Sequence, residues 1–158
     1  MGLKIIFLDI DGVLITLESA RTKVVEAKAD PRAVKALNHL VKRSGARIVI
    51  SSTWRALGLA RMEEYLMLWG VEARIFGLTP DPSDLYRGLF LSVSRTEEIN
   101  RWLRDCPEPI ESFVILDDDP IEEPLNRHHV QTNFEDGLTQ WHIDEALRIL
   151  GEREWLRG

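Results

Sequence analysis

Acidic and hydroxyl side chains follow three separate apolar segments of this sequence, at residues 4–8, 46–50 and 113–116. The segments are short and rich in isoleucine and valine, a composition that predicts buried strands. The carboxyl ends of parallel strands meet at one edge of a sheet, so the polar residues that follow them are expected to meet there. Those residues are Asp9 and Asp11 after the first segment, Ser51, Ser52 and Thr53 after the second, and Asp117, Asp118 and Asp119 after the third.

Crowded carboxylates repel one another, and a bound cation is the usual way of offsetting that repulsion. Ligands that are all oxygen select a hard ion such as Mg²⁺, which also binds the oxygens of substrate phosphates. A carboxylate beside such a phosphate can attack phosphorus and form an aspartyl-phosphate. A second carboxylate can protonate the leaving group and later activate water. These residues therefore favour Mg²⁺-dependent phosphoryl chemistry, with a hydroxyl group holding the phosphoryl oxygens.

Helical patterns alternate with the strands along the chain. Asp30 and Pro31 form a helix start, and apolar residues recur at helical spacing over residues 31–44. Further helices are predicted over residues 57–69, after a cap at Ser94, and over residues 138–150. The remaining predictions are strands over residues 71–76 and 129–132, a loop or small hairpin over residues 12–27, and mostly loop over residues 77–94.

This alternation predicts an α/β fold, a three-layer Rossmann-like, doubly wound and mainly parallel sheet with helices on both faces. The length of 158 residues fits one domain over residues 1–158, with a loosely ordered tail over residues 151–158. The net charge of −6 argues against a global basic surface for nucleic acid. A single cysteine, Cys106, excludes an intrachain disulfide and favours a cytoplasmic compartment. No segment is long and apolar enough to predict a membrane span or a signal peptide.

Three motifs carry a resemblance to a known superfamily. The segments FLDIDGVL, IVIS and VILDDD resemble the first, second and fourth motifs of the haloacid-dehalogenase-like (HAD) hydrolases, in the same order. The segments SSTWR, GLTP, RTEEINRWL, ILDDD and the later GLT are similar to a narrower group, the HAD-like domain of bacterial (Swiss Army Knife) RNA-repair proteins. The resemblance implies a capless phosphatase with a small flap hairpin after the first strand.

The resemblance also implies a role for each matching residue. Asp9 would be the nucleophile and a Mg²⁺ ligand, and Asp11 would be the general acid/base and bind the metal through its backbone carbonyl. Ser51, with Ser52, would hold the transferring phosphoryl group. Asp118 would be the other metal ligand, with Asp117 beside it. The sequence leaves open which of the three consecutive acids points inward, because side chains alternate faces along a strand.

The third motif departs from the family pattern. The family usually places a lysine near a helix start there, where it neutralises the phosphate and the nucleophile. This chain has no lysine after Lys42, and Arg95 occupies the expected position. Arginine is always charged and can bind phosphate with two donors, so it is expected to substitute, although its longer planar head needs different room.

The spacing of the motifs leaves no room for an inserted cap, so the site is expected to be open. An open site suits a macromolecular phosphate, and the resemblance points to a polynucleotide end. Because the chain is acidic, individual arginines would have to provide the contacts. The residues expected to do so are Arg21, Arg55 and Arg87, with Trp54 as a stacking platform.

Simpler explanations exist for each motif. Asp9 and Asp11 could be solvated acids in a turn, residues 51–53 a helix cap, and residues 117–119 an acidic loop. Arg95 could be a surface residue, and the pair Trp54-Arg55 a core residue followed by a surface residue. Two other functions also stay open at this point. One is a receiver-like signalling domain that is phosphorylated without turnover, and the other is a degenerate HAD domain that only binds a partner.

Overall fold

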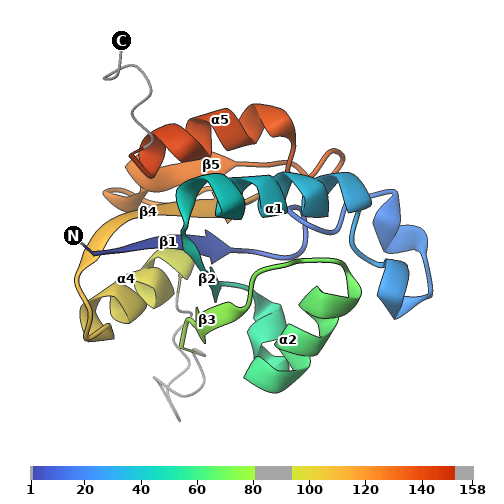
Figure 1. Ribbon diagram of the computed structural model, residues 1–158, viewed down its shortest axis with the longest axis horizontal. Helices are drawn as coiled ribbons and strands as arrows, with labels where there is room; N and C mark the ends of the chain where they lie inside the picture. The colour runs from blue at the N-terminus through green and yellow to red at the C-terminus, as the bar shows by residue number, and fades with distance from the viewer. Residues whose placement is uncertain (1, 81–93, 152–158) are drawn as a thin grey trace.

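The computed structural model describes residues 2–80 and 94–151, and five strands within them form one parallel sheet. The sheet has the order β3-β2-β1-β4-β5 (Figure 1). The chain therefore adds β2 and β3 on one side of β1 and then β4 and β5 on the other side. All four pairings are parallel, as the strand–helix alternation predicts. The strands are β1 Leu3–Leu8, β2 Arg47–Ile50, β3 Ile75–Leu78, β4 Ile110–Asp117 and β5 His129–Gln131.

Helices cover both faces of this sheet, which confirms the predicted three-layer fold. Ile6 and Leu8 of β1 pack into a core with α1 Pro31–Ser44, α2 Leu59–Leu68 and α5 Gln140–Ile149. The odd-numbered residues of β1 pack against α4 Arg95–Asp105 on the opposite face. Helices α1 and α5 lie side by side (Figure 1).

Local signals explain where α1 and α4 begin. The Asp30 carboxylate accepts a hydrogen bond from the Arg32 amide, and Pro31 follows the cap. The Ser94 hydroxyl accepts one from the Glu97 amide at 3.2 Å. Both predicted helix starts are therefore confirmed, and the second one fixes the position of Arg95 at the first turn of α4.

The helix predicted over residues 57–69 is divided in the structure. A 3₁₀ turn, η3 Thr53–Leu57, precedes α2, which begins only at Leu59. Gly58 separates the two with a φ of 87°, a left-handed value that an α-helix cannot contain. Apolar periodicity alone did not reveal this break.

The strand predicted over residues 71–76 is shifted to Ile75–Leu78. The amide of Val71 donates to the Leu66 carbonyl at the end of α2, and the amide of Glu72 donates to the Asn38 side chain in α1. These amides already bond to the end of α2 and to a side chain of α1, so sheet pairing starts later.

The flap hairpin expected within residues 12–27 is replaced by two 3₁₀ turns, η1 Ser19–Arg21 and η2 Val25–Ala27. The side chains of Thr16 and Ser19 each accept a hydrogen bond from the other's amide, at 3.2 and 2.9 Å, which closes a turn where a hairpin strand would have to run. This segment lies beyond the carboxyl end of β1 (Figure 1).

Within the described residues, the sheet and its helices carry no cap domain, in agreement with the prediction. The predicted short strand and closing helix correspond to β5 and α5. Most of the loop predicted over residues 77–94 and nearly all of the tail predicted over residues 151–158 lie outside the described residues. No helix in the described parts of the chain combines the length and apolar character that crossing a membrane requires.

Candidate active site

A row of polar residues stands at the carboxyl ends of the three central strands, β1, β2 and β4. Leu8 of β1 pairs with Ile50 of β2 and with Leu116 of β4. The ladder continues for one more step, because the Ser51 amide donates to the Leu8 carbonyl and the Asp9 amide donates to the Leu116 carbonyl. The next residue on each strand therefore stands beside its neighbours, and these three residues are Asp9, Ser51 and Asp117.

This polar row faces α4. Side chains alternate across a strand, so the row shares its face with the residues two positions earlier, Phe7, Val49 and Ile115. Those residues pack in the core beneath α4. The row itself is buried, with exposed fractions of 6% for Asp9 and 1% for both Ser51 and Asp117. Thr79, which directly follows β3 and is also buried, extends the row, and the misplaced strand prediction concealed it.

Three carboxylates gather at this row. One oxygen from each of Asp9, Asp117 and Asp118 lies within 4.8 Å of the others. Burial, together with the charge of Asp117, raises the pKa of Asp9 from 3.8 to about 8. Burial also raises the pKa values of Asp117 and Asp118. Asp119 lies exposed and outside the group, since its amide turns back to the Asp117 carboxylate at 3.0 Å.

This group fits a divalent cation such as Mg²⁺. Its donors are all carboxylate oxygens, which suit a hard ion. Within the described chain, the buried Oδ2 atom of Asp117 accepts no hydrogen bond and has only the Arg95 Nε, at 3.4 Å, as an ion-pair partner, so a lone pair is available in a place where water is excluded. Asp9, Asp117 and Asp118 are the residues that would hold the ion.

Gly12 makes room for the third carboxylate. A Cβ atom at this position would overlap the Asp118 side chain, and the φ of 80° also favours glycine. The Thr132 hydroxyl donates to the Gly12 carbonyl at 2.6 Å, and the Thr132 amide donates to the Asp117 carbonyl at 3.1 Å. The residue after β5 thus ties the turn after β1 to the end of β4.

Asp11 stands apart from the carboxylate group. Its side chain is exposed and accepts a hydrogen bond from the Trp54 indole nitrogen at 3.0 Å. The Trp54 ring is half-buried and packs edge to face with Tyr65 and Trp69. Trp54 therefore holds the Asp11 side chain outside the carboxylate group. The predicted stacking of Trp54 with a base stays a prediction.

Arg95 reaches the polar row from α4. Its Nε atom lies 3.4 Å from Asp117 Oδ2, and its Nη1 atom lies 3.3 Å from Glu98 Oε2. The charge of Arg95 lowers the pKa values of Asp9 and Asp117, although burial outweighs it. The interpretation of Arg95 as a surface residue is wrong, because its side chain is only 22% exposed and contacts the acids.

The residues after β2 divide into two kinds. The Ser51 hydroxyl is buried without a hydrogen-bond partner among the described residues, so it can donate to a ligand oxygen. The Ser52 hydroxyl accepts from the Trp54 amide at 3.2 Å and caps η3, which supports the cap explanation for this residue. Whether either hydroxyl binds phosphate stays a prediction.

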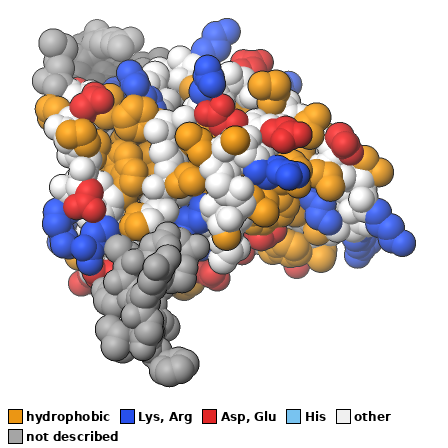
Figure 2. Space-filling model, turned by 90° about the horizontal axis from the view of Figure 1, so that it is seen from below, with side chains coloured by type: hydrophobic (Ala, Val, Ile, Leu, Met, Phe, Trp, Pro, Cys, Tyr) orange, Lys and Arg blue, Asp and Glu red, His pale blue; other side chains and the backbone are white. Residues whose placement is uncertain are grey.

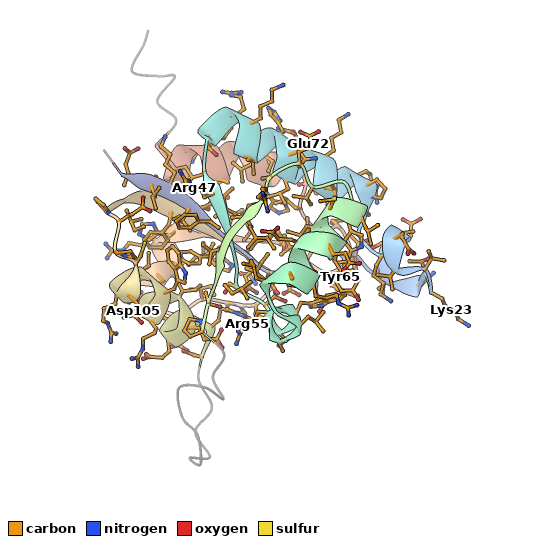
Figure 3. The ribbon with its side chains drawn as sticks, turned by 60° about the horizontal axis from the view of Figure 1, so that its bottom comes forward. Lys23, Arg47, Arg55, Tyr65, Glu72 and Asp105 are labelled. Carbon is orange, nitrogen blue, oxygen red and sulfur yellow. The ribbon has the colours of Figure 1, made fainter. Side chains whose placement is uncertain are left out.

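Arg55 is buried rather than exposed, contrary to the surface interpretation. Its guanidinium donates to Glu98 Oε1 at 2.9 Å and to the Ser52 carbonyl at 2.8 Å. Figure 3 shows Arg55 on η3, on the side that faces α4, where its guanidinium meets Glu98. Sequence reasoning missed Glu98, although its place three residues after Arg95 on a helix is a signal that could have been used.

Two further arginines were expected at the site. Arg21 is exposed on η1, and its predicted contact with substrate stays a prediction. Arg87 lies outside the described residues.

Asp9→Asn should stabilise the metal-free protein at neutral and alkaline pH. A carboxyl whose pKa rises from 3.8 to about 8 on folding binds more protons in the folded state between those values. The wild-type protein in chelator should therefore lose stability as pH rises from about 4 to about 8, and Asp9→Asn should lose less. Each kcal/mol shifts Tm by about 2–4 °C for a domain of this size, so thermal melts across this pH range measure the effect.

Asp105→Asn is the matched control, since Asp105 is exposed at the outer end of α4 (Figure 3). Its pH dependence should parallel that of the wild type. Mg²⁺ should raise the wild-type Tm more than that of Asp9→Asn. A lower Tm for metal-free Asp9→Asn at pH near 8 would contradict this electrostatic account.

One comparison with known proteins found a match. A family model described as the HAD domain in Swiss Army Knife RNA repair proteins matches residues 5–143. No curated protein and no solved structure gave a significant match. The matched range contains all the strand-end acids, Ser51 and Arg95, and it covers most of the chain. The chain therefore belongs to the family of HAD domains found in Swiss Army Knife RNA repair proteins, within a superfamily of phosphatase-like hydrolases that usually use Mg²⁺.

Proposed function

We propose that this domain is a Mg²⁺-dependent phosphatase that hydrolyses phosphomonoesters through an aspartyl-phosphate on Asp9. The observation that carries the proposal is the buried group of Asp9, Asp117 and Asp118, with the Arg95 guanidinium 3.4 Å from Asp117. Family membership supports the same class of reaction. A structural role alone does not explain why three carboxylates are held together against their mutual repulsion.

Bound Mg²⁺ would neutralise the charge of the phosphoryl oxygens and keep Asp9 ionised. The Asp9 carboxylate attacks phosphorus while the bond from phosphorus to the ester oxygen breaks. The leaving oxygen takes a proton from Asp11, which therefore enters the reaction protonated. Asp11 then removes a proton from the water that attacks the aspartyl-phosphate, which releases phosphate and restores both carboxyl groups.

Arg95 and Ser51 serve the same transfer by donating hydrogen bonds. Arg95 offers a permanent positive charge beside the acids, which suits the negative phosphoryl oxygens. Ser51 offers a buried hydroxyl that no described residue uses. The hydrogen bond from Trp54 holds the Asp11 side chain away from the carboxylate group, where it can reach a leaving group.

A macromolecular substrate, and in particular a phosphorylated polynucleotide end, fits this site best. Asp11 is exposed, and the described residues contain no cap over the site. The family description adds an association with RNA repair. The charge pattern limits how a polynucleotide is bound, because the chain has a net charge of −6. On the face shown in Figure 2, acidic and basic side chains are also interspersed. Recognition would then depend on the terminal phosphate more than on a long basic groove.

The wild-type protein should hydrolyse a chromogenic aryl phosphate with Mg²⁺ and lose the activity with chelator. Asp9→Asn should reduce kcat by at least about 10³-fold, because it removes the nucleophile. Asp119→Asn is the matched control, since it makes the same chemical change at an exposed acid outside the group and should keep most of the activity. Steady-state kinetics of purified proteins measure both.

Other outcomes would favour the alternative functions. Stoichiometric phosphorylation of Asp9 by a small phosphodonor without turnover would indicate a receiver-like domain. The absence of both turnover and labelling, with aryl phosphates and with phosphorylated oligonucleotides, would indicate a domain that only binds.

An oligonucleotide with a terminal phosphate should be a better substrate than the mononucleotide with the phosphate at the same position. The open site can contact residues beyond the terminal phosphate, which raises kcat/KM. Release of phosphate from 3′- and 5′-phosphorylated oligonucleotides and the matching mononucleotides tests this. Equal or higher kcat/KM for the mononucleotides would reject a polynucleotide end as the substrate class.

A further inference from the structure

A buried carboxylate joins two arginines directly behind the candidate active site. Glu98 Oε1 lies 2.9 Å from Arg55 Nη2, and Glu98 Oε2 lies 3.3 Å from Arg95 Nη1. Arg95 continues the chain of charges to Asp117 at 3.4 Å. Alternating charges thus run from Arg55, through Glu98 and Arg95, to the acids at the strand ends.

Among these four charged residues, only Arg95 has a partly exposed side chain. The side chains of Arg55, Glu98 and Asp117 are 6%, 5% and 2% exposed, whereas that of Arg95 is 22% exposed. The buried partners cannot exchange their contacts for water without a large cost. Arg95 is therefore the one member of these four that both contacts the buried group and remains accessible to a substrate.

The carboxylates of Asp117 and Glu98 also set the orientation of the Arg95 guanidinium. Asp117 Oδ2 lies 3.4 Å from Nε and Glu98 Oε2 lies 3.3 Å from Nη1, so the two carboxylates contact different nitrogens of the planar group. A planar group contacted at two of its three nitrogens has little freedom to rotate. Neither of these two contacts uses Nη2, which is left as a donor for a phosphoryl oxygen.

We propose that Glu98 is a positioning residue that sets the orientation of Arg95, and that Arg55 neutralises Glu98 so that this carboxylate can stay buried and charged. The inference rests on the proposed phosphatase function, in which Arg95 touches the transferring phosphoryl group. A lysine ammonium can approach an oxygen from many directions, whereas an arginine fork binds well only in a defined orientation. An arginine in this place therefore needs a second buried carboxylate to hold it.

These contacts give Arg55 a role other than direct phosphate binding. Its guanidinium is already engaged with Glu98 and with the Ser52 carbonyl. It connects α4 to the turn after β2 and so holds Glu98 and the Ser51–Ser52 segment in a fixed relation. Arg55 acts on the reaction only through its neighbours.

Two variants separate positioning from simple charge balance. Glu98→Gln removes the negative charge and leaves Arg55 buried without a counter-ion, so both Tm and kcat should fall. The double variant Glu98→Gln/Arg55→Gln removes both charges and should recover most of the Tm. Its kcat should nevertheless stay low, by up to about 100-fold, because Arg95 still lacks its anchor. KM for the aryl phosphate should change less than kcat.

A spectroscopic readout makes the test independent of activity. In protein labelled with 15N-arginine, the Nε–H signal of Arg95, assigned by its loss in Arg95→Lys, should exchange slowly in the wild type. It should move toward the signals of exposed arginines in Glu98→Gln and in the double variant. Glu97→Gln, the same chemical change one residue earlier on α4, should alter neither this signal nor kcat.

The outcomes distinguish this inference from the proposed function. If the wild type has no phosphatase activity but the Arg95 signal depends on Glu98, the proposed function is wrong and the positioning is right. If the Arg95 signal is unchanged in Glu98→Gln, or if the double variant recovers kcat together with Tm, the inference is overturned. If the double variant does not fold, Glu98→Asp decides. It keeps the charge but is too short to span both arginines, so the inference requires a displaced Arg95 signal and a lower kcat.

Discussion

Three carboxylates held within 4.8 Å of one another repel each other, and the surroundings of Asp9 can be understood as responses to that repulsion. Two of the three are buried, where water cannot screen their charges. The sheet itself creates the crowding, because its register places Asp9 and Asp117 side by side. Gly12 allows the third, Asp118, to pack against the turn. Such an arrangement costs stability in the metal-free protein, which is typical of a site built for ligand binding.

Helix α4 supplies the opposing charge. Its Ser94 cap places Arg95 in the first turn, where the helix amides also carry partial positive charge. The same turn contains Glu98, which would add to the repulsion if Arg55 did not accompany it. The charges of the site therefore alternate. The acids that face a ligand contact Arg95, and Arg95 contacts Glu98, which forms a buried ion pair with Arg55.

The alternation of parallel strands with helices and the main site acids followed from the sequence because both depend on local patterns. Apolar runs that end in acids determine where Asp9 and Asp117 stand, and strand periodicity places them on one face. Asp118, and not Asp119, joins the carboxylate group because its side chain fits in the space above Gly12. The alternation of side chains along a strand does not encode that space. The burial of Arg55 also escaped prediction, since its partner Glu98 is 43 residues away in the sequence. Charged side chains are usually exposed, so only the fold reveals an exception.

The central claim is that the carboxylate group binds a divalent cation in front of Arg95. Crystals grown with Mn²⁺, with diffraction data collected at a wavelength where manganese scatters anomalously, test it most directly. The account predicts one strong anomalous peak in contact with carboxylate oxygens of Asp9, Asp117 and Asp118, which disappears in crystals of Asp9→Asn. An empty group at millimolar Mn²⁺, or a peak bound only by other residues, would contradict it.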